Sequence, residues 1–199
     1  MKKEKLIITI FLLLLVAPIF LSEFRLNLLG KYVSFGIAAL AIDLLWGYTG
    51  ILSLGHAVFF GLGGYCMGAY IKLQTETLPD FMMWCGMTEL PWFWKPFQYF
   101  WFALPMAIIL PIFISLLIGI PTFRVGIKGV YFTILTQALA LIFVTFFIGQ
   151  QLYTGGTNGI TNLQSVFGFS LFDAKVMQVI YLITVAILIL SFFFCRFLV

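Results

Sequence analysis

Six long apolar runs recur along the chain, separated by shorter polar segments. They cover Leu6–Leu21, Tyr32–Trp46, Ile51–Ile71, Tyr99–Ile120, Val130–Ile148 and Val176–Cys195. A helix needs roughly 20 apolar residues to cross the hydrocarbon core of a bilayer. The pattern therefore predicts an all-α fold, a polytopic transmembrane helical bundle with about six crossings.

The first run permits two interpretations. It follows Lys2, Lys3 and Lys5, and a basic start before an apolar stretch is also typical of a cleaved signal peptide. Residues 17–22, which end the run, make a poor small-residue cleavage site. A retained first helix is therefore favoured.

The join between the second and third runs is the most informative segment. Residues 47–56 hold glycines, hydroxyl groups, a tyrosine and the only histidine of the chain. Backbone amides cannot stay unpaired in hydrocarbon, so a break in a helix survives only inside a protein bundle or beside a wet cavity. We expect an interrupted helix near residues 47–56, which is the pattern of a solute path through a membrane.

Composition supports a membrane protein. The 199 residues are 63% hydrophobic and 9% charged, whereas a soluble domain carries about 25% charged residues. The bilayer is the expected solvent, and residues 1–199 are expected to form a single transmembrane domain. The formal charge of +4 is small and spread out, so no nucleic-acid partner is expected. Lysines and arginines near the helix ends slightly favour a cytoplasmic N-terminus and C-terminus.

Sequence signals of an enzyme or a metal site are missing. The chain carries no G-x-S-x-G or H-E-x-x-H motif, and the single histidine removes most acid–base constellations. Cys66, Cys85 and Cys195 are odd in number, far apart and without a Cys/His cluster. We expect no catalytic residue, no metal site and no directly bound cofactor.

Small residues mark one face of the third run. Ala57, Gly61, Gly64 and Gly68 follow one another at steps of four, three and four residues, so they share a helical face. Small side chains let helix backbones approach closely in a membrane. Helix packing is the preferred role for these residues, and a backbone-lined wall of a passage is the rival.

Eight polar or ionisable residues in or beside the apolar runs are candidates for a solute path. They are Asp43, Tyr48, Thr49, Ser53, His56, Thr133, Thr136 and Gln137. Asp43 is interpreted as an interfacial anchor or as a path residue, because an intramembrane carboxylate usually has a partner or water. A local hydrogen bond is favoured for His56. Gln137 follows Thr133 by four residues, and their shared face either links two helices or lines a passage for a neutral solute.

Three blocks of this sequence resemble a known family. Asp43–Tyr65, Gly119–Gln137 and Thr154–Ile160 occur in the same order in the membrane permeases of branched-chain amino acid ABC importers. Within that family, Ser53–His56 and Gly129–Leu139 are most similar to the urea-transport branch.

The resemblance implies a larger assembly in the cell inner membrane. It comprises a second, related permease, two cytoplasmic ATPase subunits that bind ATP, and an extracytoplasmic solute-binding protein. The permease itself is not an enzyme. It spans the lipid bilayer several times and alternates access, while the binding protein supplies most of the selectivity. A solute site near the bilayer midplane, lined by broken helices, suits that task.

Length separates this chain from the family. Its members are much longer, and the cytoplasmic loop that docks onto the ATPase follows the sixth crossing, where this chain ends at Val199. The resemblance therefore suggests the N-terminal part of a permease, with the C-terminal part and its ATPase-coupling loop missing. Urea is the favoured solute, because the path residues offer hydroxyl and amide groups rather than paired charges. The alternatives are a branched-chain amino acid permease and a truncated, non-transporting membrane scaffold.

Overall fold

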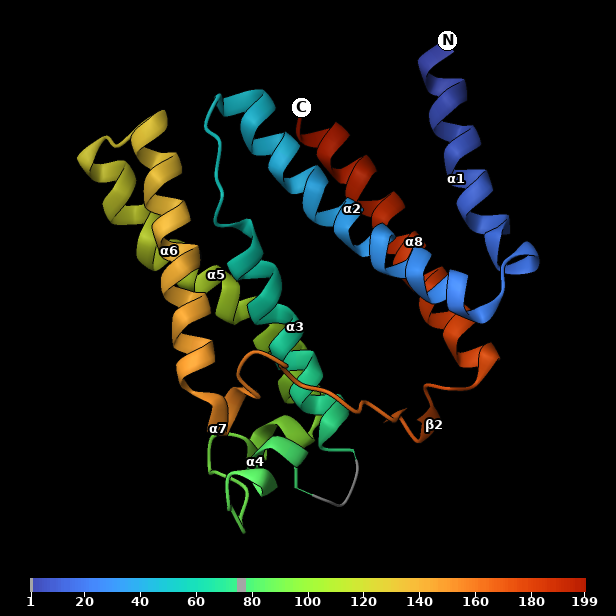
Figure 1. The fold of residues 1–199 in the computed structure, drawn as a ribbon. Coiled ribbons are helices and arrows are strands. Elements are labelled where there is room, and N and C mark those ends of the chain that lie inside the picture. The colour runs from blue at the N-terminus through green and yellow to red at the C-terminus, as the bar shows by residue number, and fades with distance from the viewer. Residues whose placement is uncertain (1, 75–77) are drawn as a thin grey trace. The chain divides into compact units, whose positions relative to one another are not determined.

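The structure, a computed structural model, is almost entirely helical and describes residues 2–74 and 78–199 (Figure 1). In these ranges the α-helices are α1 (Lys2–Phe20), α2 (Glu23–Thr49), α3 (His56–Lys72), α4 (Asp80–Trp84), α5 (Phe100–Val125), α6 (Val130–Gly149), α7 (Gln151–Thr154) and α8 (Ala174–Leu198). A 3₁₀-helix η1 (Lys95–Gln98) precedes α5, and two short strands, β1 (Ser165–Val166) and β2 (Phe169–Ser170), pair with each other. The all-α prediction is confirmed.

Four of the predicted crossings are long and apolar enough to span a membrane. They are α2, α5, α6 and α8. At 1.5 Å per residue, the 17 residues of α3 extend about 26 Å, near the short end of what a bilayer accepts. Crossings by α3 and by the 19-residue α1 stay predictions.

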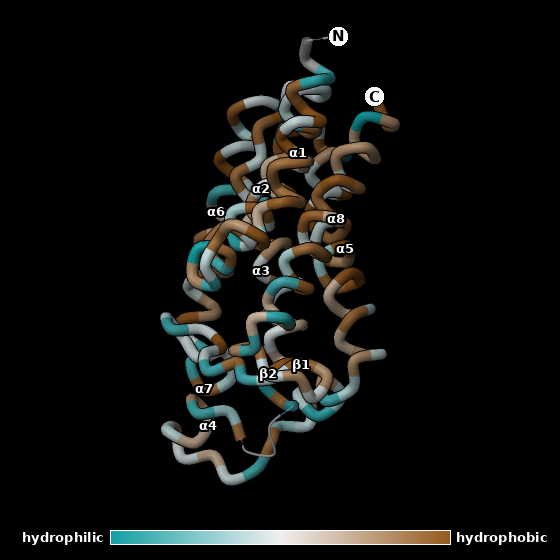
Figure 2. Tube along the Cα trace, turned by 90° about the vertical axis from the view of Figure 1, so that its right-hand side faces the viewer, coloured by the Kyte–Doolittle hydropathy of each residue, from teal (hydrophilic) through white to brown (hydrophobic). Residues whose placement is uncertain are grey.

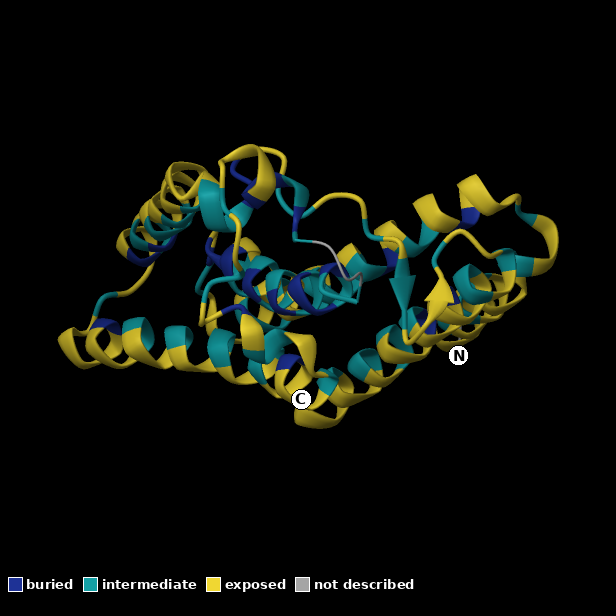
Figure 3. Ribbon diagram, turned by 90° about the horizontal axis from the view of Figure 1, so that it is seen from below, coloured by how far each residue is buried: buried dark blue, intermediate teal, exposed yellow. Residues whose placement is uncertain are grey.

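The long helices carry apolar side chains on their outer faces. Figure 2 shows apolar residues along most of their length, with hydrophilic positions frequent around α4 and α7. Figure 3 shows that most residues of these helices are exposed. Leu117 on α5 and Ile142 on α6 are 60% and 65% exposed. Lipid or another protein must cover such surfaces, as expected of a multi-pass membrane protein.

Two helices extend beyond the predicted bounds. α2 has 27 residues and begins well before Tyr32, and α5 continues through Pro121 to Val125, where Gly126 closes it at a φ of 80°. The predicted run Tyr99–Ile120 stops just before Pro121, so the expected end of this helix is wrong. A proline removes one helical hydrogen bond, but unwinding the helix in an apolar medium would leave several backbone groups unpaired.

The described residues divide into two compact units, and α2 runs through their boundary. The first comprises residues 1–44 and 170–199, and the second comprises residues 45–169. In the first unit, α2 and α8 bury Leu26, Val33, Tyr181 and Val185 against each other. The expectation of a single domain over residues 1–199 stays a prediction.

A proline in α1 explains a polar contact of the first unit. Pro18 has no N–H, so the carbonyl of Leu14, four residues earlier, lacks its helical donor. The hydroxyl of Tyr181 donates to this carbonyl at 2.9 Å. The tyrosine thereby links α8 to α1 and satisfies a backbone group that water cannot reach in a bilayer.

The second unit is built around α3, which packs mainly against α5 and also contacts α6 (Figure 1). A Cβ atom added to Gly63 would lie 3.2 Å from the carbonyl oxygen of Ala107. That carbonyl has no helical donor, because residue 111, four positions later, is a proline. Gly63 therefore allows the backbones of α3 and α5 to meet at a carbonyl freed by Pro111.

Candidate functional site

The predicted interruption between the second and third apolar runs is present. α2 ends at Thr49 and α3 begins at His56, so residues 50–55 form a non-helical segment, which we call the broken segment. Gly50 has a φ of 67°, which favours glycine and turns the chain out of the helix. Gly47 lies inside α2, so the break begins three residues later than the sequence suggested.

Threonines of α6 bind the backbone of the broken segment. The N–H of Leu54 donates to Oγ1 of Thr136 at 3.1 Å, and Oγ1 of Thr133 donates to the carbonyl of Leu52 at 2.8 Å. Thr136 in turn donates to the carbonyl of Thr133 at 3.0 Å. Two hydroxyl groups on one helix therefore replace hydrogen bonds that the interruption removes from another, which is how a membrane protein tolerates a break.

Short-range contacts complete the broken segment. The N–H of Gly55 donates to Oγ of Ser53 at 3.3 Å, and Nδ1 of His56 lies 3.2 Å from the carbonyl oxygen of Ser53. A Cβ atom at Gly55 would lie 3.3 Å from both Cβ and the carbonyl oxygen of Thr136. Ser53 and Thr136 are buried, at 5% and 6% exposure. The site is therefore a close junction of backbone and hydroxyl groups.

Four candidate path residues lie outside this junction. Tyr48 is 63% exposed, and Asp43 is an exposed residue of α2 in the first compact unit. Thr49 terminates α2: its hydroxyl donates to the carbonyl of Leu45 at 2.6 Å and accepts the N–H of Ile51 at 3.3 Å. Gln137 is exposed. The residue that contacts the broken segment together with Thr133 is instead Thr136, three residues later. A role of all eight residues in a solute path stays a prediction.

The glycine face of α3 is not the face of closest helix contact. Among the described residues, no heavy atom of another element lies within 4 Å of a Cβ built at Gly61 or Gly64, whereas Gly68 faces the Ile160 side chain at 3.3 Å. The close approach to a neighbouring backbone occurs at Gly63, on a different face. Ala57 and Gly61 instead line a cavity of about 340 Å³ between α3 and α6.

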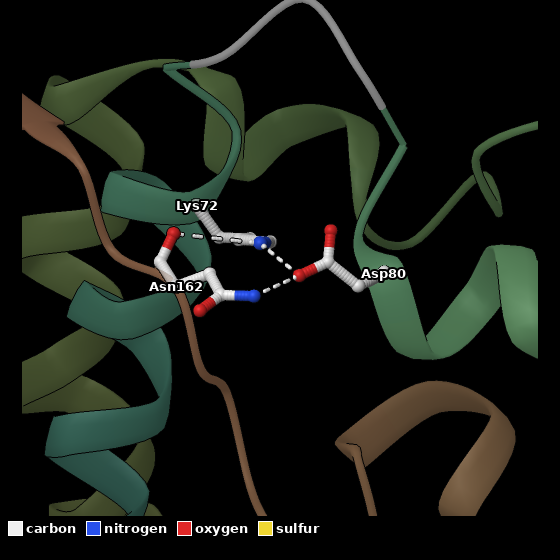
Figure 4. A network of polar contacts seen from close by, with 3 residues as sticks. All are labelled: Lys72, Asp80 and Asn162. Atoms are coloured by element: carbon white, nitrogen blue, oxygen red, sulfur yellow. Dashed lines mark hydrogen bonds and ion pairs between the residues drawn. The ribbon is translucent and has the colours of Figure 1, made fainter.

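A polar network beyond the C-terminal end of α3 holds two loops together (Figure 4). Nζ of Lys72 lies 3.1 Å from Oδ2 of Asp80, and Nδ2 of Asn162 donates to the same oxygen at 2.6 Å. Lys72 also donates to the carbonyl of Asn162 at 3.5 Å. The hydrogen bonds from Asn162 and Lys72 hold the pKa of the Asp80 carboxyl below its usual value. Sequence patterns missed this network, because Asn162 lies 82 residues from Asp80 in the chain.

The glycine-rich block at residues 154–160 forms tight turns after α7. Gly155 has a φ of 78°, and a Cβ atom there would overlap the carbonyl group of Gly159. The carbonyl of Thr154 accepts a hydrogen bond from the hydroxyl of Tyr65 at 3.3 Å. The turns therefore position a backbone acceptor against α3.

Comparisons with known proteins agree with the arrangement. The family model described as "Branched-chain amino acid transport system / permease component" matches residues 24–199. The permease protein LivM of the high-affinity branched-chain amino acid transport system of Escherichia coli K12 is 26% identical over 162 residues. Its counterpart in Salmonella typhimurium LT2 is 25% identical over 162 residues. Each match covers 81% of this chain and 32% of the relative, so the chain spans about a third of the length of these relatives. No solved structure matches the chain.

The family match extends from the start of α2 to the end of the chain, and it includes the broken segment, α6 and the glycine turns. It places the chain among transport permeases rather than enzymes and accounts for the apolar helices of a multi-pass inner-membrane protein. The chain belongs to the family of permease components of branched-chain amino acid transport systems.

Proposed function

We propose that this chain supplies part of the membrane-spanning permease of an ATP-driven importer, and that the solute is a branched-chain amino acid. The observation that carries the proposal is the broken segment at 50–55, held by Thr133 and Thr136 beside the cavity between α3 and α6. Interrupted helices at a cavity are the usual site of solute passage in transporters.

The chemistry of the cavity favours an aliphatic solute over urea. Val58, Leu62 and Phe143 are among its lining residues, and apolar side chains predominate. Thr133 and Thr136, two of the hydroxyl groups proposed for urea, are engaged with the backbone of the broken segment. The two relatives are also permeases of branched-chain amino acid systems by name. Urea stays the second candidate, supported by the sequence blocks around Ser53–His56 and Gly129–Leu139.

The proposed assembly has four further subunits. A second permease, two ATPase subunits and an extracytoplasmic solute-binding protein accompany this chain in the lipid bilayer. ATP binds to the ATPase subunits, and this chain binds no cofactor directly. The cycle of ATP binding opens the permease alternately to the two sides of the membrane. The binding protein delivers the solute, and the permease carries it across.

Uptake of labelled leucine and labelled urea by cells that express the whole transport system tests the proposal. Deleting the gene for this chain is expected to abolish leucine uptake and leave urea uptake unchanged, and a plasmid copy is expected to restore leucine uptake. Loss of urea uptake alone would establish the second candidate. No loss of either uptake would favour the non-transporting scaffold.

A further inference from the structure

Two cavities meet on one side of α3. The first, of about 340 Å³, lies along residues 57–65 of α3 and residues 140–148 of α6, with Gly156 and Thr157 at its edge. The second, of about 480 Å³, lies along residues 62–69 of α3, residues 93–97, and residues 146–154. Both cavities fall within the compact unit of residues 45–169. Their order along α3 leads from the broken segment toward the loops that hold Asp80 and Asn162.

Three residues line both cavities: Leu62, Tyr65 and Phe147. The rings of Tyr65 and Phe147 meet edge to face, with centroids 4.6 Å apart and planes inclined by 62°. The two rings therefore form a common wall. An edge-to-face pair of this kind is worth about 0.5–1.5 kcal/mol beyond its buried area.

The two rings of the common wall are held differently. The Tyr65 hydroxyl donates to the carbonyl of Thr154 at 3.3 Å, and the Thr154 hydroxyl donates to the carbonyl of Gln150 at 2.9 Å. The tyrosine is thus fixed to the turn that follows α6. The Phe147 ring has no polar atom and is held by apolar contacts alone: besides Tyr65, its centroid lies 6.5 Å from that of Phe143 and 6.1 Å from that of Phe146.

We propose that the two cavities are successive chambers for the apolar side chain of an aliphatic amino acid, and that Tyr65 and Phe147 are the partition between them. The proposal rests on the function proposed above and names the solute site within it. Both volumes fall in the range of small-molecule pockets, and both linings are mainly apolar. Gly61 keeps the first chamber open, since a Cβ atom there would find no heavy atom within 4 Å among the described residues.

The native thiol of Cys66 reports on the second chamber. Cys66 lines the second cavity but not the first, and it is 4% exposed. The test uses membranes from cells that express the whole transport system, with Cys85→Ser and Cys195→Ser in this chain. The measured quantity is the rate at which N-ethylmaleimide modifies Cys66, followed by mass spectrometry of the peptide that contains it.

Removing the Phe147 ring is expected to connect the two chambers. Phe147→Ala should raise the rate of Cys66 modification at least several-fold, and saturating leucine should slow it again. Val58→Ala is the control: it shortens a side chain of α3 that lines the first cavity only. Phe147→Leu is the milder variant to use if Phe147→Ala does not accumulate in the membrane.

Equal rates of Cys66 modification in the Phe147 and Val58 variants would overturn the partition. A faster rate in the Phe147 variant that leucine does not slow would overturn the assignment of an aliphatic solute to these chambers. Leucine uptake by the unsubstituted system is measured separately and decides the proposed function. If that system carries urea and not leucine, the proposed solute fails, while the ratio of the two modification rates still decides whether Tyr65 and Phe147 separate the cavities.

Discussion

At the scale of single residues, the hydroxyl groups of α6 behave in two ways. Thr145 donates to the carbonyl of Leu141 on its own helix at 2.9 Å, the usual contact of a threonine in a helix. Thr133 reaches the carbonyl of Leu52 at 2.8 Å, shorter than its 3.4 Å contact with Gly129 in its own helix. Only the position of the neighbouring backbone distinguishes the two, so the sequence could propose Thr133 as a link between helices but could not identify its partner.

Replacing Thr136 by valine should destabilise the broken segment. Valine keeps the shape of threonine but leaves the part-buried N–H of Leu54 without its acceptor, and the bilayer core offers no water to replace it. An unpaired buried donor costs about 1–3 kcal/mol, so the thermal unfolding temperature in detergent should fall by several degrees. Thr145→Val is the control, because the Thr145 hydroxyl is exposed and contacts only its own helix. Equal unfolding temperatures for the two variants would contradict the assigned hydrogen bond.

At the scale of helices and loops, prolines decide where neighbouring elements touch. Pro18 frees the carbonyl of Leu14, which Tyr181 binds, and Pro111 frees the carbonyl of Ala107, which Gly63 faces. The Tyr181 hydroxyl supplies the hydrogen bond that Pro18 removed, whereas at Gly63 the missing side chain makes room for the carbonyl that Pro111 freed. Pro18 and Pro111 thus each lie four residues after a carbonyl that a neighbouring element meets, although the sequence does not say which neighbour.

Alanine scanning of the glycines of α3 should separate packing from open space. Gly63→Ala places a Cβ atom 3.2 Å from the carbonyl oxygen of Ala107 and should cost about 1–3 kcal/mol of stability, because helix α5 must move away. Gly64→Ala, the adjacent position, meets no heavy atom within 4 Å among the described residues and should leave the unfolding temperature almost unchanged. A larger effect at Gly64 than at Gly63 would show that partner subunits, rather than α5, pack on this helix.

The loop network predicts a loss of stability in acid. The pKa of the Asp80 carboxyl is lowered in the folded protein by the hydrogen bonds from Asn162 and Lys72, so folding favours the ionised form. The contribution of Asp80 to stability is complete above the ordinary aspartate pKa of about 3.9. It is lost as the pH falls through the lower pKa that the carboxyl has in the folded protein.

Thermal unfolding measured from neutral pH down to about pH 3 checks this sign. Asp80→Asn should lower the unfolding temperature at neutral pH and remove part of the decline in acid. Glu89→Gln, an exposed acidic residue of the same loop region, is the control. If the network does not stabilise the protein, the unfolding temperature of Asp80→Asn will depend on pH in the same way as that of the unsubstituted protein.

At the scale of the whole molecule, the number of crossings follows from hydropathy and length. α2, α5, α6 and α8 satisfy both requirements by themselves. α3 satisfies them only narrowly, because the break takes five residues from the predicted run of 51–71 and leaves 17 residues in the helix. Whether α3 crosses the bilayer decides on which sides its two ends lie.

Reporter fusions test the crossing by α3. Alkaline phosphatase, which is active only outside the cytoplasm, should be active when fused after Leu90 and inactive when fused after Gly50, because six crossings place these points on opposite sides. A fusion after Gly126 should be inactive as well. The same activity at Gly50 and Leu90 would show that α3 does not cross.

The sequence by itself determined the environment, the helical class, the interruption and the family, because each depends on local composition or on the order of short blocks. Apolar length predicts a membrane helix without knowledge of its neighbours, and Gly50 marks a turn wherever it lies. Tertiary structure alone decided that Thr136 rather than Gln137 joins Thr133 at the broken segment, that Gly63 rather than Gly64 meets α5, and that Lys72, Asp80 and Asn162 converge. Helix rotation sets these contacts, and in a membrane the apolar residues on all sides of a helix leave no hydrophobic pattern from which that rotation can be read.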